Sequence, residues 1–218
     1  DMVEQLGRLK KPSAKKFKKD RKLFFVPLII QPFEKDKEFT ELFEKYWKQA
    51  QDHVNALEEK LGNVKRIYHE LITHSGKIGI SSIKKMNAGS HEVVSNSLEK
   101  GAIIQPIEDD NTLLEFMDWS RCMSIGLQSQ KVFSQVYESF MEIQKKRNEI
   151  IANNIDKTLK NNQIGLLLMR EGHQIQFPQD IQVFYVAPPS LDELRRWAQN
   201  KNDIIQKEFQ GEKETEDK

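Results

Sequence analysis

The sequence predicts an α/β protein, a layered sandwich in which a mostly parallel central sheet is flanked by long helices. Two observations support this prediction. Short apolar runs typical of buried strands alternate along the chain with longer amphipathic segments typical of helices, an order found in parallel sheets. The chain has 218 residues, of which 38% are hydrophobic, and this is enough to bury one core. We expect one domain over residues 22–203, preceded by a flexible basic arm (1–21) and followed by a polar, disordered tail (204–218).

In the first half of the chain, strand and helix candidates follow each other in a regular order. The run KLFFVPLII (22–30) is a buried-strand candidate, although Pro27 favours a sheet edge or a bulge. Apolar residues spaced by three and four between Phe39 and Leu61, with Gly62 as a stop signal, predict an amphipathic helix. Further along we expect a short strand (64–72), a turn at Gly76 and Gly79, helical structure (80–100) with a break at 87–89, and another short strand (101–107).

The second half begins with a long helical segment. Residues 111–160 contain no proline and one glycine, Gly126, and their apolar residues recur at helical spacing. Two strand candidates follow, IGLLLM (164–169) and IQVFYVA (181–187). A last helix is expected to begin with Ser190 as its N-cap and with Glu193 completing a capping box.

Composition excludes several classes of protein. Lys and Arg number 34 against 33 Asp and Glu, so no overall charge draws the chain to nucleic acid or membrane. No apolar stretch is long enough to span a bilayer, and no secretory signal is recognisable at the start. We therefore expect a soluble, cytoplasmic protein. Cys122 is the only cysteine, which rules out an internal disulfide and a cysteine-rich zinc site.

Positive charge is concentrated near the N-terminus. Residues 8–22 hold nine Lys or Arg against one acid, Asp20. One interpretation is a solvated terminus that keeps the protein soluble. The other is an arm that contacts the phosphates of RNA or of the ribosome, because clustered lysines release counterions without needing a fold.

The polar stretch between the last two strand candidates is the first candidate for a site. In LLLMREGHQIQFPQDIQVFYVAPP, Glu171 and His173 lie just past the end of an apolar run. Open α/β sheets bind ligands at the carboxyl ends of their strands, so this location favours a functional role. A plain hairpin between two strands would use similar residues and is the alternative.

Arg147 falls on the apolar stripe of the long helical segment, in line with Phe133 and Phe140. A buried guanidinium needs an anionic partner, because an unpaired buried charge is very costly. Glu70, at the end of its strand candidate, and Glu171 are the candidate partners. Snorkelling of Arg147 at the end of the stripe and a purely structural ion pair are the alternatives.

The sequence HELITH, with His69, Glu70 and His74, resembles a zinc-protease helix but has the wrong spacing. Its histidines are five residues apart rather than four, which turns them by roughly 140° on a helix. In a strand, His69 and Glu70 would point to opposite faces. A divalent metal such as zinc is still conceivable from His69 or Glu70 together with Glu171 and His173.

The motifs of several enzyme classes are absent from the sequence. It has no G-x-S-x-G elbow, no P-loop and no G-x-G-x-x-G fingerprint, which disfavours a serine hydrolase, an NTPase and a Rossmann dehydrogenase.

Four segments carry a likeness to known proteins. YHE, MDWSRC, KKRNEIIA and LLMREGHQIQFPQDIQVFYVAPPSLDE resemble a group of prokaryotic hypothetical proteins. A shorter likeness is to the TraB/ChaN/Tiki-like superfamily, with Glu70 after one strand, Arg147 and Asn148 on a helix, and His173 after a later strand. This resemblance implies an α/β fold with a pocket and, in some members, metal-dependent hydrolysis. The chain departs from that pattern where Asn148 replaces an acid and where the first strand lacks a Gly-x-x-His motif.

The sequence thus predicts a polar pocket formed by Glu70, Arg147, Glu171 and His173. The leading hypothesis is a hydrolase, with or without a metal, acting on a small anionic substrate. His173 would be the metal ligand or general base, either glutamate the second ligand or acid–base group, and Arg147 the clamp for the anion. The alternatives are a non-enzymatic module that binds RNA or the ribosome through residues 8–22, and a protein-interaction scaffold.

Overall fold

The computed structural model of the protein describes residues 20–31 and 36–216, and it confirms the α/β fold with helices around a parallel sheet. Five strands form one sheet in the order β3-β2-β4-β1-β5, and every pair is parallel. The strands are β1 (Arg21–Pro27), β2 (Arg66–His69), β3 (Ile103–Ile104), β4 (Ile164–Met169) and β5 (Ile181–Tyr185). The described helices are α1 (Lys37–Leu61), α2 (Gly76–Met86), α3 (Ala88–Glu99), α4 (Asp110–Ser124), α5 (Gln130–Thr158) and α6 (Pro189–Glu216).

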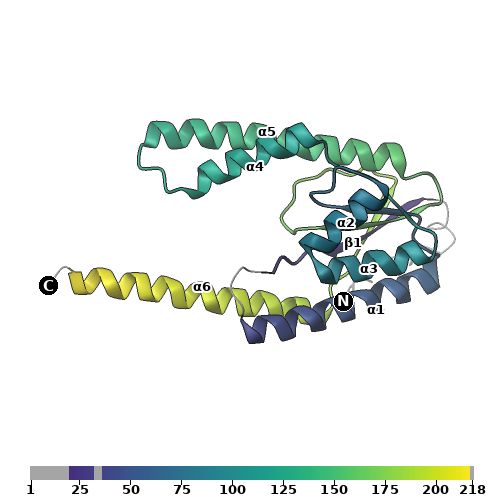
Figure 1. Ribbon diagram of the computed structural model, residues 1–218, viewed down its shortest axis with the longest axis horizontal. Helices are drawn as coiled ribbons and strands as arrows, with labels where there is room; N and C mark the ends of the chain where they lie inside the picture. The colour runs from purple at the N-terminus through teal and green to yellow at the C-terminus, as the bar shows by residue number, and fades with distance from the viewer. Residues whose placement is uncertain (1–19, 32–35, 217–218) are drawn as a thin grey trace, which may run out of the picture.

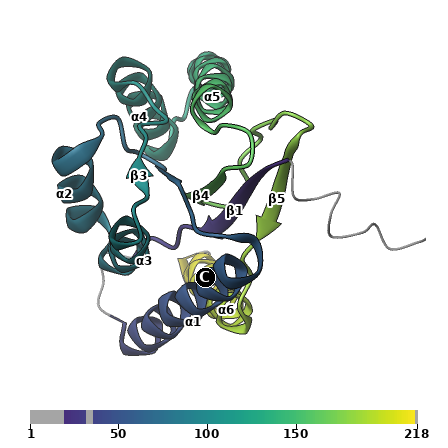
Figure 2. The same cartoon turned by 90° about the vertical axis from the view of Figure 1, so that its right-hand side faces the viewer.

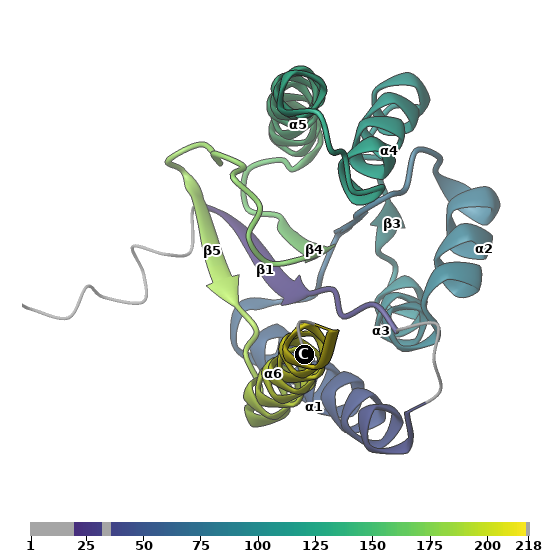
Figure 3. The ribbon, with the colours of Figure 1, turned by 90° about the vertical axis from the view of Figure 1, so that its left-hand side faces the viewer.

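Helices cover both faces of the sheet. Helices α1, α3 and α6 lie on one side of it, and α4 and α5 lie on the other (Figures 2 and 3). Each face has its own apolar core, because successive strand residues point in opposite directions. On β4, for example, Leu166 and Leu168 pack toward α1, whereas Leu167 and Met169 pack toward α5. This division decides on which side of the sheet every polar side chain at the strand ends emerges.

The first strand lies inside the sheet rather than at its edge. β1 pairs with β4 on one side and with β5 on the other. Pro27 is its last residue, and the next amide, that of Leu28, donates to Met169 O at 2.9 Å. The edge or bulge predicted from Pro27 is therefore wrong, because a proline at the end of a strand removes no donor from the ladder's interior.

Helix α1 begins and ends as its sequence predicts. The Asp36 carboxylate accepts from the amide of Phe39, and the Gly62 amide donates to Glu58 O. Its apolar face is buried against the sheet and α6. By contrast, the turn predicted at Gly76 and Gly79 is the first turn of α2. Glycine fits at position 79 because a Cβ there would lie 2.3 Å from His74 O.

The segment between β4 and β5 is a crossover connection and not a hairpin. Both strands run parallel to β1, which lies between them. Residues 170–180 therefore travel from the carboxyl end of one strand to the amino end of the other without forming a helix. Ile175 is buried in the core on the α5 side, and Phe177 packs against that core. The first polar residues of this stretch, from Arg170 to His173, thus emerge at the carboxyl edge of the sheet.

Both predicted ends of the domain need correction. Arg21 and Lys22 are buried in β1, and Arg21 pairs with Asp156 and Asp180, each at 2.7 Å. The basic arm can therefore extend no further than about residue 20, and its remaining cations lie outside the described residues. At the other end, α6 continues to Glu216 where a disordered tail was expected, in a segment rich in the good helix formers Glu, Lys and Gln.

The start of α6 also differs from its prediction. The helix begins at Pro189, whose fixed φ suits a first helical position. Ser190 therefore lies inside the first turn, and its hydroxyl has no hydrogen-bond partner in the described structure. The Glu193 carboxylate accepts from Lys45 Nζ instead of closing a capping box.

No helix among residues 20–31 and 36–216 is long and apolar enough to cross a membrane.

Candidate functional site

A buried ion pair joins the ends of two strands to α5. The Arg147 guanidinium donates through Nε and Nη2 to Glu108, at 2.5 and 2.7 Å, and through Nη2 to Glu70 at 3.1 Å. Glu70 directly follows β2, and Glu108 follows β3 by four residues. All three side chains are buried. The predicted contact between Arg147 and Glu70 is thus confirmed, and a second carboxylate completes the compensation of the buried charge.

Arg170 holds Glu70 from the other side. Its backbone amide donates to Glu70 Oε2 at 2.8 Å, and its Nη2 donates to Oε1 at 2.8 Å. Burial alone would raise the pKa of Glu70, but the hydrogen bonds and charge of Arg170, with the charge of Arg147, outweigh it and hold that pKa below its usual value. Glu70 is therefore a carboxylate whose lone pairs are occupied within the protein, and it is poorly placed to act as a base.

The backbone next to Glu70 is strained, and the same network stabilises it. Leu71 has φ of 67°, a conformation that costs a non-glycine residue free energy. Its amide donates to Glu108 Oε1 at 2.7 Å. On the opposite side, Phe116 of α4 lies beneath the Arg147 guanidinium, 4.5 Å from ring centroid to Cζ. Three segments, those that follow β2 and β3 and helix α4, therefore fix Arg147 in place.

His173 lies half-buried among aromatic rings. Its imidazole makes edge contacts with Phe25 and Phe177, with centroids 5.1 and 5.9 Å apart. Nδ1 accepts a hydrogen bond from the backbone amide of Ile175 at 3.4 Å. Burial lowers the pKa of His173 below its usual value, and the charge of Glu70 opposes that shift in part. The neutral ring with an accepting Nδ1 carries its proton on Nε2, for which the described residues provide no partner.

Glu171 does not join Arg147. Its carboxylate accepts from Tyr185 Oη and from Arg195 of α6. Burial would raise the pKa of Glu171, but the bonds from Arg195 and Tyr185 hold it below the usual value. Of the two partners predicted for Arg147, Glu70 is the one that pairs with it. The Glu171 side chain turns toward α6, where Arg195 is available.

His69 belongs to the opposite face of the sheet, as strand alternation predicts. Its Nδ1 donates to the Glu70 carbonyl at 2.7 Å, and its Nε2 lies in hydrogen-bond contact with Ser90 Oγ at 3.0 Å. Burial lowers its pKa to about 4. His69 and His173 therefore do not share a metal site. Within residues 20–31 and 36–216, no group of three or more His, Cys, Asp or Glu side chains is placed to hold a metal ion.

The four residues predicted to form the pocket line a cavity of about 260 Å³ at the carboxyl edge of β2 and β4: Glu70, Arg147, Glu171 and His173. Arg170 and His173 contribute from the crossover, and Arg147 and Asn148 from α5. Its walls also include Gln144, a second carboxamide of α5. The Arg170 side chain is 46% exposed, so it is the cation of this network that a ligand can reach most easily.

Two members of the site, Glu108 and Arg170, were not among the residues singled out from the sequence. Both could have been found with the rule that selected Glu70, since each follows a strand candidate at its carboxyl end. No pattern in the sequence shows that Glu171 pairs with a different arginine from Glu108. The partner of Glu171 depends on how α6 packs.

Comparisons with protein-family models, with curated proteins and with solved structures found no match to this chain. The family resemblances described above therefore stay predictions, and the functional argument depends on the geometry of the site.

Proposed function

We propose that the cavity beside Arg170 and His173 binds a small molecule through a carboxylate or phosphate oxygen. The observation that supports this most strongly is an imbalance between donors and acceptors. Every carboxylate of the site already accepts from an arginine: Glu70 and Glu108 from Arg147, and Glu171 from Arg195. Several donors of the same cavity have no partner in the described structure, among them Nη1 of Arg170 and Nε2–H of His173. A ligand that satisfies them must bring acceptor oxygens.

Arg170 and His173 differ in the kind of hydrogen bond that they offer to a ligand. Arg170 is a cation, and Glu70 fixes one edge of its guanidinium so that the remaining edge is preoriented. His173 is a neutral donor, held by Ile175 and by the two aromatic rings. Preorientation reduces the entropy lost on binding and makes each hydrogen bond more favourable.

This geometry changes the roles proposed for a hydrolytic reaction. A ring nitrogen that carries a proton can neither act as a base nor bind a metal until the proton is lost. In a hydrolase His173 and Arg170 would therefore stabilise negative charge that develops on a carbonyl or phosphoryl oxygen. Arg147, which the sequence suggested as the anion clamp, would instead be a positioning residue that holds Glu70 and, through it, Arg170.

Binding can be tested by nuclear magnetic resonance with acetate and inorganic phosphate as separate probes. We expect saturable shifts of the His173 ring signals with at least one anion, and Arg170→Gln should weaken that binding by about tenfold or more, the loss expected for one charge-assisted pair. Arg121→Gln is the matched control, because Arg121 is an exposed arginine paired with Asp118 on α4.

Two results would count against the proposal. One is the absence of saturable shifts with both anions. The other is an equal effect of the two arginine substitutions, which would indicate general charge attraction. A preference for acetate over phosphate, or the reverse, would identify the oxygen group that the cavity accepts.

We also propose that the protein works in the cytoplasm, since one cysteine leaves no pair to be oxidised within the chain.

A further inference from the structure

A second and larger cavity adjoins the anion-binding cavity along α5. Its volume is about 860 Å³, and Gln144 and Asn148 line both cavities. It follows α5 from Met141 to Asn153, a length of about 18 Å at the rise of a helix. We propose that this groove binds the extended C-terminal segment of a peptide, whose terminal carboxylate enters the cavity beside Arg170 and His173. This inference rests on the proposed function.

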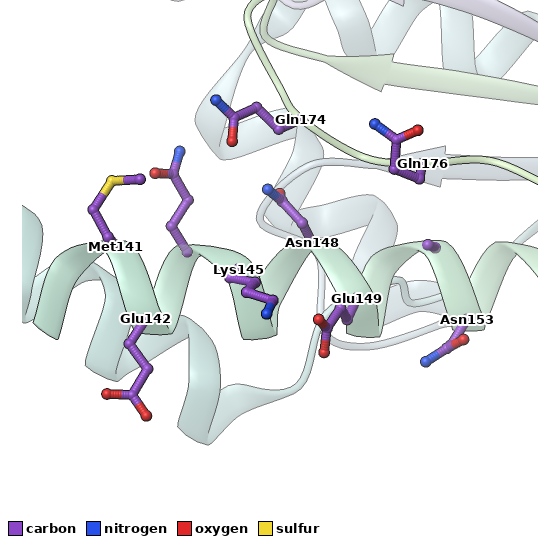
Figure 4. Close-up of a pocket in the computed structure, with 10 residues that line it drawn as sticks. Met141, Glu142, Lys145, Asn148, Glu149, Asn153, Gln174 and Gln176 are labelled. Carbon is purple, nitrogen blue, oxygen red and sulfur yellow. The ribbon is translucent and has the colours of Figure 1, made fainter. Parts of the chain in front are cut away.

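Side-chain carboxamides dominate the groove. Gln174 and Gln176 of the crossover stand on one side, and Met141 and Asn148 point toward them from α5 (Figure 4). The side-chain carboxamides of Gln174, Gln176 and Asn148 have no hydrogen-bond partner among the described residues. The contrast with Asn154 is informative, because that amide, further along the same helix, donates to Ile107 O at 3.0 Å. Each free carboxamide offers both a donor and an acceptor, the pair of groups that a peptide unit also carries.

The crossover has the alternating burial pattern of an extended segment, which can pair with another extended chain. Along residues 173–177 burial alternates, with Ile175 buried and Phe177 half-buried, while Gln174 and Gln176 are exposed. Side chains two residues apart in such a segment repeat every ~6.6 Å, as do the equivalent groups of a peptide lying beside it. No described residue bonds to the backbone amides of Gln174 and Gln176. They therefore stay available for β-strand addition.

The charges and surfaces of the groove favour a peptide over other chains. Glu142 and Glu149 outnumber the single cation, Lys145, so a nucleic acid backbone would be repelled. Sugars commonly stack on an aromatic ring, and no aromatic ring lines the groove. A saccharide ligand is therefore disfavoured. Met141, at its outer end, is 37% exposed and begins an apolar stretch that continues along α5 to Tyr137 and Phe133. A flexible thioether suits apolar peptide side chains of varied shape.

The length of the groove sets the size of the ligand. The two cavities meet at Gln144 and Asn148, so a chain that runs from there to either end of the groove spans about 10 to 14 Å, which corresponds to about three or four residues of extended chain at ~3.3 Å each. The carboxylate end is assigned to the smaller cavity because the exposed Arg170 guanidinium there is a cation whose Nη1 has no partner in the described structure. A longer peptide would leave this groove at its apolar end or at Asn153.

The test uses acetylated oligo-alanines of one to five residues, each with a free carboxylate and, separately, with a C-terminal carboxamide. Binding to the full chain is measured by calorimetry or by nuclear magnetic resonance. We expect affinity for the carboxylate series to rise by at least about tenfold from one residue to four, as two or more net hydrogen bonds would give. The carboxamide series should bind more weakly at every length.

Variants separate the groove from the anion cavity. The double substitution Gln174→Ala and Gln176→Ala should abolish the gain with length but leave acetyl-alanine binding unchanged, because neither residue lines the smaller cavity. Gln135→Ala, on an exposed position of α5 outside both cavities, is the matched control. Both glutamines are exposed, so the double variant is expected to fold.

Each other outcome has a defined meaning. Carboxylate binding that does not depend on length would overturn this inference and leave the proposed function standing. Carboxamides that bind as well as carboxylates would overturn the anion-binding proposal instead. The absence of any acetyl-alanine binding would overturn the peptide assignment. Binding of a chito-oligosaccharide that is lost in the double variant would show that the groove accepts sugars, and would overturn the peptide assignment.

Discussion

Arg147 places a positive charge in the apolar layer between α5 and the sheet, and the chain compensates it with two carboxylates and an aromatic ring. A buried pair of this kind gives little net stability, because the desolvation of its members offsets their attraction. Removing one member is costly, since the other stays buried and unpaired. The network therefore acts mainly on position: it holds Glu70, and Glu70 holds Arg170.

We predict that Glu108→Ala destabilises the protein strongly. Glu108 makes two hydrogen bonds to Arg147 and one to the strained Leu71, so its loss should cost about 3 to 5 kcal/mol in the free energy of unfolding, the usual range for breaking a buried ion pair. Urea denaturation measures this directly. Asp118→Ala, which removes the exposed partner of Arg121, should change it by less than about 1 kcal/mol. Similar values for the two variants would mean that the buried network is not formed.

His69 should make stability depend on pH. Its pKa is about 4 in the folded chain, below the usual 6.5, because burial disfavours the charged ring. Between these pH values the unfolded chain takes up a proton that the folded chain refuses, so stability falls as pH drops from 6.5 to 4 and is fully present above 6.5. In His69→Gln, the urea midpoints measured at pH 7, 6 and 5 should lie closer together than those of the parent protein. His53→Gln, at an exposed position, should retain the full dependence; a parent without this dependence would contradict the burial of His69.

At the scale of elements, the strand ends decide which polar residues meet. The apolar runs of the sequence predicted the strands, and the stripe on α5 predicted a buried partner for Arg147. Glu70, Glu108 and Arg170 converge because β2, β3 and β4 all end at the same edge. The crossover was harder to predict, since a hairpin and a crossover need similar turn residues between two apolar runs. Only the insertion of β1 between β4 and β5 separates them, and that is a long-range pairing which local patterns do not encode.

Close packing of α3 on α1 gives a prediction for an element. A Cβ at Gly89 would lie 2.1 Å from Cδ1 of Trp47, a ring that is 4% exposed. Gly89→Ala should therefore cost about 1 to 3 kcal/mol through overpacking, although alanine favours helices by up to about 1 kcal/mol. Ser95→Ala, a half-buried position of the same helix, is the control. If thermal denaturation shows Gly89→Ala to be as stable as the parent, the two helices do not approach so closely.

On the scale of the whole molecule, the sheet separates structural from functional chemistry. The face covered by α1, α3 and α6 holds the larger apolar core and the satisfied His69. The other face, under α4 and α5, carries the anion-binding cavity, the adjoining groove and the unpartnered donors of Arg170 and His173. The α4–α5 hairpin and α6 extend beyond the sheet in the same direction (Figure 1). Function is therefore expected on one side of the molecule, where the crossover meets α5.

RNA binding by the basic arm stays a prediction, and the structure sharpens its test. Seven of the nine cations lie in residues 8–19, whereas Arg21 and Lys22 belong to β1. Deleting residues 1–19, and no further, should abolish any RNA binding and preserve the fold. With about half of the seven cations engaged, the full chain should show a slope of about −2.5 in log K against log salt. Binding that survives the deletion with the same slope would exclude the arm as the contact.

The proton on the His173 ring tests the account most directly, because the donor role of this side chain separates the anion-binding cavity from a metal or general-base site. Long-range proton–nitrogen spectra of the full chain, with signals assigned through His173→Gln, measure it. We predict the neutral form near pH 7, with Nε2 protonated and Nδ1 unprotonated, since Nδ1 accepts from the Ile175 amide and burial lowers the ring's pKa. A neutral ring with the proton on Nδ1 would contradict this account, because Nε2 would then be free to accept a proton or bind a metal.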